Sequence, residues 1–304
     1  MTHLFNGKNR WPVLEEELLR LNADIFGLQE VQRDHFECHF GPSLSKEGYA
    51  AYYKRKIGLA WDGCAVFVRR SKLEVVNYRT VEYFIGSGTS MDRDQIGQIF
   101  RLRSKETRKE FIFVNTHLLF DPLRGDIKLG QLAMLIANIE DCANHLVLFS
   151  VCLRGLHCSE LSGQGLSGGP YVEADRILPP MTNIGRDSMF VNNEAYREPV
   201  NADCFTHPLR LASVYSHVSE NGEKEISTYH KEMANPDFLF YSIGQKLITD
   251  SNTLVLEDPQ LRLLRRLSLP DFPTLKKACG PWPNHYVPSD HVPLVADFIL
   301  SNLE

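Results

Sequence analysis

The feature that most constrains this chain is a series of short apolar segments that end in polar residues. Ile25–Val31 reads IFGLQEV and carries Glu30 near its end, and Phe111–Asn115 reads FIFVN and is followed closely by His117. Short segments that are apolar at nearly every position are typical of strands buried on both faces. Further strand-like segments are Gly63–Val68, Leu73–Phe84, Ile96–Leu102, His145–Phe149, Leu211–Val214, Asp237–Ser242, Lys246–Leu256 and Pro293–Leu300.

Helical periodicity alternates irregularly with these strands, which predicts an α/β fold with mixed sheets. Pro12 stands at a favourable first helical position. Apolar residues recur at helical spacing after it, at Leu14, Leu18 and Leu21. A second helix is predicted after Gly125, with one apolar stripe made by Leu129, Leu132, Leu135, Ile136 and Ile139. Glycine and proline punctuate residues 150–208, which we predict to be irregular.

Charge and cysteine usage narrow the class of protein. The formal net charge of −5 argues against a protein that holds nucleic acid by bulk charge, although a bound cation would still allow an enzyme to meet phosphate. The seven cysteines are odd in number and contain no CxxC, which favours an intracellular compartment, the cytoplasm with the nucleus as alternative. Zinc at Cys152, His157 and Cys158 lacks a second ligand pair. We expect no membrane span, because no apolar segment reaches about 18 residues.

Five polar residues at strand ends are the candidate site. Glu30 ends a buried strand, where an acid is costly unless it is paired or binds a metal. His117 follows another strand, where it either packs or contacts phosphate. Asp290 and His291 precede the last strand and offer a metal ligand beside a general acid or base. Asp237 opens a further strand, and a carboxylate is what a catalytic histidine needs to fix its tautomer. The Asn115 amide beside His117 would also suit a phosphate oxygen.

Several sequence blocks carry a family resemblance. Residues 24–36 read DIFGLQEVQRDHF, and Asp62–Phe67 (DGCAVF), Asn115–Leu118 (NTHL), Asp126–Gln131 (DIKLGQ) and Ser213–His217 (SVYSH) follow in order. The chain thereby resembles the endonuclease/exonuclease/phosphatase superfamily. Within it, the chain is most similar to the branch that holds the Angel proteins, nocturnin and the carbon-catabolite-repression deadenylases, and to the Angel proteins in particular.

The resemblance implies a fold, a cofactor and roles for the candidate residues. It implies one domain over residues 1–304, a four-layer, DNase I-like sandwich of two mixed sheets flanked by helices. It implies Mg²⁺, with Mn²⁺ as a possible substitute, and hydrolysis of RNA as a 3′-to-5′ poly(A) exonuclease or an RNA-end phosphatase. By matching position, Glu30 and Asp290 would hold metal and His117 would contact phosphate. His291 would stabilise or protonate the reacting phosphate, and Asp237 would orient it.

The sequence departs from this family pattern in two places. Relatives carry Gly-Asp-Phe-Asn after the strand that matches His145–Phe149, whereas here no Asp or Asn follows until Asp175. Relatives also begin with a strand ending in a metal-supporting Asn, so we expect a truncated N-terminus. These departures predict impaired activity and a disrupted central segment. The alternative is an inactive RNA-binding or scaffold protein that uses Lys54–Lys56 or Arg101–Arg103. An inositol or sphingolipid phosphatase fits the Angel-like blocks less well.

Overall fold

The computed structural model describes most of the N-terminal half of the chain and parts of the remainder. The described residues are 7–121, 124–140, 146–152, 166–167, 189–191, 204–206, 209, 211–215, 218–219, 221–243, 246–248, 254–256, 260–278, 280–284 and 286–301. Most of segment 150–208, which we predicted to be irregular, lies outside these residues, as do His157 and Cys158 of the zinc alternative.

Two sheets form the centre of the described structure. The smaller is antiparallel, in the order β1 (Ile25–Gln32), β3 (Asp62–Arg69), β2 (Tyr49–Arg55). The larger is mixed, because β6 and β7 run parallel and its other neighbours run antiparallel. Its order is β11 (Leu211–Ser213), β14 (Asp237–Ser242), β7 (Leu146–Cys152), β6 (Glu110–His117), β5 (Ile96–Ser104), β4 (Leu73–Glu82).

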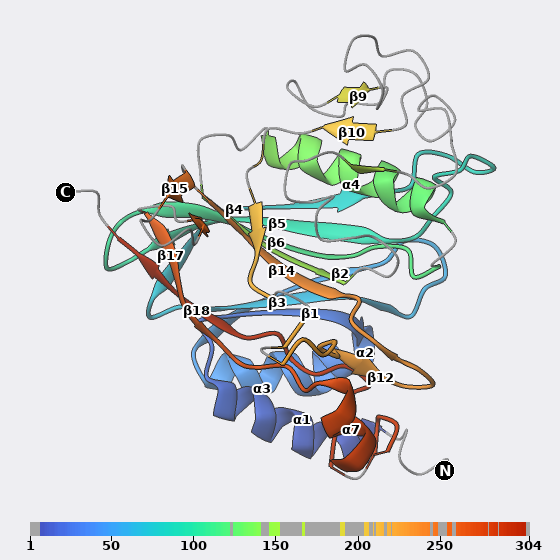
Figure 1. The fold of residues 1–304 in the computed structure, drawn as a ribbon, viewed down its shortest axis with the longest axis vertical. Coiled ribbons are helices and arrows are strands. Elements are labelled where there is room, and N and C mark those ends of the chain that lie inside the picture. The colour runs from blue at the N-terminus through green and yellow to red at the C-terminus, as the bar shows by residue number, and fades with distance from the viewer. Residues whose placement is uncertain are drawn as a thin grey trace.

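Helices cover the outer face of each sheet, which makes four layers (Figure 1). The smaller sheet is covered by α1 (Gly7–Leu21) and α3 (Gly41–Lys46), and the larger by α4 (Gly125–Glu140). Shorter helical elements are α2 (Arg33–His35), the π-helical turn η1 (Phe36–Phe40) and α7 (Phe272–Ala278). The α/β sandwich of two β-sheets flanked by helices that the family resemblance implied is therefore confirmed.

The remaining described strands form short pairs and ribbons. They are β8 (Leu166–Ser167), β9 (Met189–Val191), β10 (Cys204–Thr206), β12 (Thr228–Tyr229), β13 (Met233–Ala234), β15 (Lys246–Ile248), β16 (Leu254–Leu256), β17 (Leu261–Arg266) and β18 (Ala296–Leu300). The β17–β18 pair packs its apolar side chains against Tyr241 of β14 and Val214. This packing brings the C-terminal segment against the larger sheet.

Alternation along the strands separates the layers. Ala65 and Phe67 of β3 pack toward α1 and α3, whereas Val66 and Val68 pack toward the larger sheet, where they meet Phe113 of β6. Because successive strand residues face opposite sides, polar residues at even positions of β3 also face the space between the sheets. The same rule puts the odd positions of β6 on that inner face. Site residues at the ends of β3 and β6 are therefore directed toward one another.

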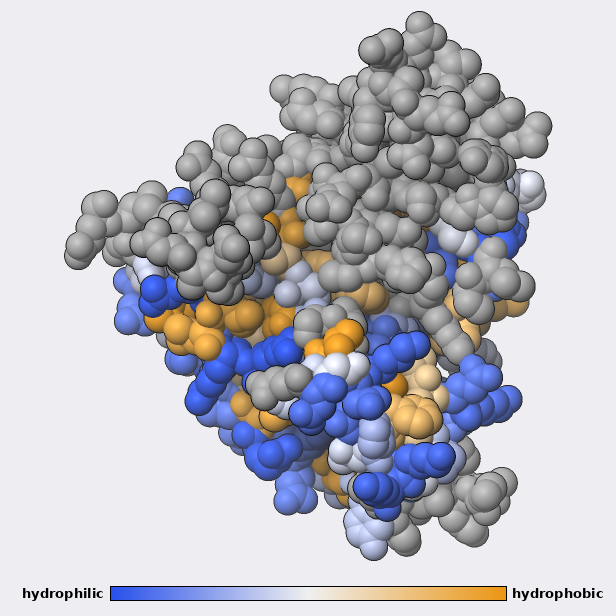
Figure 2. Space-filling model, viewed as in Figure 1, coloured by the Kyte–Doolittle hydropathy of each residue, from blue (hydrophilic) through white to orange (hydrophobic). Residues whose placement is uncertain are grey.

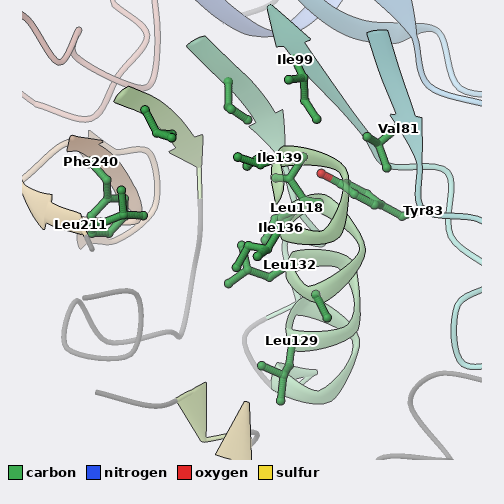
Figure 3. Close-up of a cluster of buried hydrophobic side chains, with 14 of the residues drawn as sticks. Val81, Tyr83, Ile99, Leu118, Leu129, Leu132, Ile136, Ile139, Leu211 and Phe240 are labelled. Carbon is green, nitrogen blue, oxygen red and sulfur yellow. The ribbon is translucent and has the colours of Figure 1, made fainter. Parts of the chain in front are cut away.

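The outer face of the larger sheet forms the largest apolar cluster with α4 (Figure 3). Leu132, Ile136 and Ile139 of the helix are all 2% exposed or less and belong to the same buried cluster as Val81 and Ile99 of the sheet (Figure 3). Burial of this stripe at about 25 cal/mol per Å² fixes α4 on the sheet.

On the face seen in Figure 2, hydrophilic residues alternate with several apolar groups. No helix within the described residues is long and apolar enough to cross a membrane.

Two boundaries differ from the sequence predictions. Helix α1 begins at Gly7, so Pro12 lies inside it and not at its first position. Pro12 is the sixth residue of this helix, beyond the first four N–H groups that lack an intrahelical acceptor, so it removes one main-chain hydrogen bond. Strand β7 continues to Cys152, three residues past the predicted end at Phe149. Neighbouring strands on both sides, β6 and β14, supply main-chain partners for these extra residues.

Candidate functional site

Three neighbouring strands of the larger sheet bring two predicted residues to one edge. β6 ends at His117 and β14 begins at Asp237. Between them, Cys152 at the end of β7 is the register partner of both residues. His117 and Asp237 thus lie one strand apart on either side of position 152. Sites in α/β folds are commonly built at such strand ends.

Glu30 reaches this edge from the smaller sheet through a β-bulge. The pairing of β1 with β3 shifts register between Leu28 and Val31, and Glu30 has φ of 54°. Left-handed backbone in a non-glycine residue costs about 1–3 kcal/mol, and bulges commonly re-aim a side chain next to a site. Val31 returns to the apolar layer beneath the sheet. The bulge therefore frees Glu30 from strict alternation and lets its carboxylate approach His117.

Glu30, Asp62 and His117 form a compact group whose ligand atoms all lie within 4.8 Å of one another. His117 Nε2 lies 3.8 Å from Glu30 Oε1, which is too long for a direct hydrogen bond. Lys56 Nζ binds Asp62 Oδ2 at 2.5 Å, and both side chains are largely buried. Partial burial raises the pKa of Glu30; Lys56 opposes this shift, and the negative charges of Asp290 and Asp62 add to it.

His117 is buried and neutral at physiological pH. Burial lowers its pKa to about 4, and the positive charge of Lys56 acts in the same direction. Its Nδ1 has no hydrogen-bond partner in the part of the chain that the structure describes. The ring is therefore an uncharged group whose tautomer the described residues do not fix.

This depressed pKa predicts a loss of stability in mild acid. Between pH 6.5 and about 4 the unfolded chain binds a proton at residue 117 that the folded chain rejects, so stability must fall as pH falls through this window. At about 1.4 kcal/mol per pKa unit, we expect a loss on the order of 3 kcal/mol. Urea unfolding of chelator-treated protein at pH 7 and pH 4.5 measures it. The His117→Gln variant should lose clearly less between these pH values; an equal loss in both proteins would contradict the assignment.

Asp237 and His291 form a hydrogen-bonded pair beside this group. His291 Nδ1 donates to Asp237 Oδ2 at 2.6 Å, and Ser227 Oγ donates to the same oxygen at 2.5 Å. Burial alone would lower the pKa of His291, but the hydrogen bond and charge of Asp237, with Asp290 and Glu30, raise it overall. The carboxylate fixes the proton on Nδ1 and leaves Nε2 free to meet a substrate.

The segment that carries Asp290 and His291 is hydrogen-bonded to β12 and to Ser227, which precedes it. The amide of Tyr229 donates to the carbonyl of Asp290 at 3.1 Å, and Thr228 Oγ1 donates to it at 2.7 Å. The amide of Val292 donates to the carbonyl of Ser227 at 2.8 Å. These bonds hold His291 against Asp237 although 54 residues separate them. The charge of Asp290 contributes to the raised pKa of Glu30.

The Asn115 amide has a structural task and is not open to phosphate. It is fully buried and accepts a hydrogen bond from Gln29 Nε2 at 2.6 Å. Its Nδ2 donates to the Leu28 carbonyl and to Gln98 Oε1, both at 3.2 Å. Our expectation that this amide contacts phosphate is therefore wrong. Asn115 joins the two sheets beneath the site, because an unpaired buried amide would be costly there.

The donor set fits a hard divalent cation. Mg²⁺ prefers oxygen ligands, and the carboxylates of Glu30 and Asp62 each offer one within 4.8 Å of the other and of a His117 ring nitrogen. Glu30 is the most accessible member, with 65% of its side chain exposed. Burial is the largest cause of the raised pKa of Glu30, and the charges of Asp290 and Asp62 add to it, so a bound cation would favour its charged form. Because Lys56 already compensates Asp62, Glu30 is the principal candidate ligand.

The structure thus brings Glu30 and His117 together with Asp62 and pairs Asp237 with His291, but Asp290 is not part of the Glu30–Asp62–His117 group. Asp62, Lys56 and Ser227 are site residues that we did not predict. Asp62 stood in the quoted DGCAVF block, and its position before an apolar strand was the available signal. Lys56 had been interpreted as part of a solvated charge run, yet only 12% of its side chain is exposed. Ser227 precedes no apolar run and gave no signal. Contacts between distant segments reveal Lys56 and Ser227, and a sequence pattern cannot supply them.

Comparisons with known proteins agree with this fold. No family model matches the sequence. Angel homolog 2 of Danio rerio is 34% identical over 336 residues, covering 96% of this chain and 59% of the relative. The human Angel homolog 2 is 31% identical over 345 residues, covering 96% and 63%. The chain therefore spans about three fifths of the length of these curated relatives.

Solved structures give the same relationship. The crystal structure of ANGEL2, described as a 2′,3′-cyclic phosphatase in complex with adenosine-2′,3′-vanadate, superposes with a TM-score of 0.81 at 31% identity, covering 99% of this chain and 88% of that one. The human nocturnin catalytic domain superposes with a TM-score of 0.58 at 20% identity, covering 97% and 87%, and shows the shared fold alone. On these grounds the chain belongs to the Angel proteins of the endonuclease/exonuclease/phosphatase superfamily.

Proposed function

We propose that this chain is a Mg²⁺-dependent phosphoesterase that acts on RNA ends, with 2′,3′-cyclic phosphates as its substrate and a slow turnover. The observation that carries the proposal is the Asp237–His291 pair, held at 2.6 Å beside the Glu30–Asp62–His117 group. One part offers a proton donor with a fixed tautomer, and the other offers ligands for a cation.

The pKa values of the two histidines are shifted in opposite directions, which suits them to different tasks. The raised pKa of His291 keeps a larger fraction of its ring protonated near neutral pH, so Nε2 donates a proton or a charged hydrogen bond to a phosphate oxygen. His117, with its pKa lowered to about 4, contacts phosphate as a neutral imidazole. Asp237 orients His291 and stabilises its charge. Division of charge between two groups in this way is how acid and base roles are assigned in one site.

Glu30 and Asp290 are the residues that we assign to Mg²⁺, and Mn²⁺ has the oxygen-ligand preference to replace it. Both are acids, and their mutual repulsion contributes to the raised pKa of Glu30. When bound, the ion supplies positive charge to phosphate oxygens and lowers the pKa of a coordinated water. Lys56, bound to Asp62, adds a fixed positive charge at the same edge.

The comparisons favour a cyclic phosphatase over a 3′-to-5′ poly(A) exonuclease. ANGEL2, which is 31% identical over nearly the whole chain, is described as a 2′,3′-cyclic phosphatase. Nocturnin, at 20% identity, supports only the fold. Poly(A) trimming stays the alternative substrate class, since it uses the same groups. A phosphatase for inositol or sphingolipid has no supporting observation.

One observation favours a second candidate, an inactive RNA-binding protein. The strand position between His117 and Asp237 belongs to Cys152, and no Asp or Asn follows in the sequence before Asp175. A carboxylate or amide to align the attacking water is therefore missing from β7. General-base assistance is worth about 10²–10⁴ in rate, so its loss makes turnover slow before it abolishes binding.

In a direct test, the purified protein is incubated with Mg²⁺ and with short RNAs that differ only at the 3′ end. We expect slow opening or removal of a 2′,3′-cyclic phosphate, and no shortening of an adenylated RNA with a 3′-hydroxyl. The Glu30→Gln variant should lose the Mg²⁺-dependent part of the rate. Glu47→Gln should not, because this exposed acid precedes β2 at the end of the strand far from Lys56. A rate that is unchanged in Glu30→Gln or by a chelator would overturn the proposal.

A further inference from the structure

Two of the three most exposed large apolar side chains in the described part of the chain are aromatic and lie close in sequence to site residues. Leu59, Tyr286 and Trp61 are 93%, 87% and 85% exposed. Trp61 directly precedes Asp62, and Tyr286 precedes Asp290 by four residues. Single exposed apolar residues need no explanation, but a set that borders one polar site marks a binding surface.

Trp61 is presented by a closed hairpin. The amide of Lys56 donates to the carbonyl of Asp62 at 3.0 Å, and the amide of Arg33 donates to the carbonyl of Trp61 at 3.3 Å. The backbone on both sides of Trp61 is thus bonded to ordered elements, whereas its ring is bare. Since consecutive Cα atoms lie about 3.8 Å apart, the ring begins one residue from the carboxylate that lies within 4.8 Å of Glu30 and His117.

Tyr286 is presented by a second fastened turn. Asn284 Oδ1 accepts the amide of Tyr286 at 2.9 Å, and Arg10 Nε donates to the carbonyl of Pro288 at 2.6 Å. Four residues of chain span at most about 14 Å, so this ring lies within reach of a ligand at Asp290. Both exposed aromatic rings therefore stand on segments whose backbone is already ordered, which lowers the entropy cost of a stacked contact.

In the two basic runs at residues 54–56 and 101–103, most of the charged groups are already paired with acids. Arg101 and Arg103 both pair with Glu110, and Arg103 also pairs with Glu74. In the basic run at residues 54–56, Lys54 forms an ion pair with Glu82. With a net charge of −5, bulk charge supplies little affinity for a polyanion. Affinity for a strand must then come from contacts that do not depend on charge, and stacking on aromatic rings is one.

We propose that Trp61 and Tyr286 stack on the bases of a single-stranded RNA end whose terminal phosphate lies at the Glu30–Asp62–His117 group. The inference rests on the proposed function, because it names how that site holds its substrate. Stacking accepts any base, so the platform selects single strands over paired ends without reading sequence. Trp61, next to Asp62, meets the base nearest the reacting phosphate, and Tyr286 meets a base farther along.

The test measures binding without turnover. A labelled oligoadenylate and an abasic strand of equal length and charge are titrated with protein in chelator, and fluorescence anisotropy reports affinity. Trp61→Leu keeps an apolar side chain but removes the ring. We expect it to weaken oligoadenylate binding about 5- to 150-fold, as loss of one stacked base implies, and to leave abasic binding unchanged. Trp61→Phe should restore most of the affinity. Leu264→Ala, an exposed residue on β17, is the control and should behave as wild type.

The outcomes separate this inference from the proposed function. Ring-dependent binding without hydrolysis of cyclic ends would support the stacking platform and overturn the proposed function. Hydrolysis of cyclic ends with wild-type binding by both Trp61→Leu and Tyr286→Leu would overturn the platform and leave the function standing. An equal loss of abasic and oligoadenylate binding in Trp61→Leu would also overturn it, because a ring that only shapes the loop would affect both ligands alike.

Discussion

Insertion of Gly-Asp-Phe-Asn after Phe149 is expected to raise turnover on RNA with a 2′,3′-cyclic phosphate by about 10²–10⁴-fold, the range of general-base assistance. The first three inserted residues would take the β7 positions now held by residues 150–152, and Ser150 onward would follow the new Asn. Those positions pair with β6 up to His117 and with β14 from Asp237. The new Asp would take position 151, opposite Thr116 and Phe238, and the new Asn would follow position 152, so the carboxylate and the amide would flank the position that lies between His117 and Asp237.

The matched control is an insertion of Gly-Ala-Phe-Ala at the same place. It changes the length and the path of the chain equally but adds no polar group. If the rate gain comes from water alignment, only the Asp- and Asn-containing insertion gains activity. Equal rates for the wild type and both insertions would show that β7 carries no missing function. A gain in both insertions would mean that chain length, and not a carboxylate, limits the native protein.

The layered fold could be predicted from the sequence because its signals are local. β1, β3, β5 and β6 form where runs of apolar residues predicted strands, and α4 begins at Gly125 as its apolar stripe indicated. Strand β2 went unpredicted, because its sequence YAAYYKR mixes small, aromatic and basic residues. It forms because all seven of its residues pair with β3. Main-chain pairing of this kind overrides weak strand propensity.

The candidate site was predicted as a set of residues but not as a geometry. Glu30, His117 and Asp237 were recognisable because each stands at or near one end of an apolar strand. The bulge that turns Glu30 inward gave no signal, since it depends on two residues of β1 lying opposite one of β3. The Lys56–Asp62 pair was equally hidden, because a short run of basic residues is usually a solvated face. Sequence thus supplies the chemistry of the groups, and long-range packing supplies their distances.

Conversion of Asp237 to asparagine is expected to lower the rate on cyclic ends by roughly 10³–10⁴-fold, the scale seen when an orienting carboxylate beside a catalytic histidine is replaced by its amide. The measurement is made in the Asp- and Asn-containing insertion variant, where the rate leaves room for a large fall. The carbonyl oxygen of the new amide would still accept a hydrogen bond from the Ser227 hydroxyl, so the fold should survive. Asp297→Asn removes a surface ion pair with Arg265 and serves as the control, because such pairs contribute little.

A titration separates lost orientation from lost structure. In the native protein the hydrogen bond and charge of Asp237 outweigh burial and raise the pKa of His291. Removal of that charge leaves burial in place, so the pKa of His291 must fall in Asp237→Asn. Nuclear magnetic resonance of the ring followed with pH should show this fall. Because His291 acts as a proton donor, the high-pH limb of the residual activity should move to lower pH with it. An unchanged His291 titration together with a collapsed rate would contradict the electrostatic role, because a carboxylate at 2.6 Å cannot be neutralised without altering the charge on its partner.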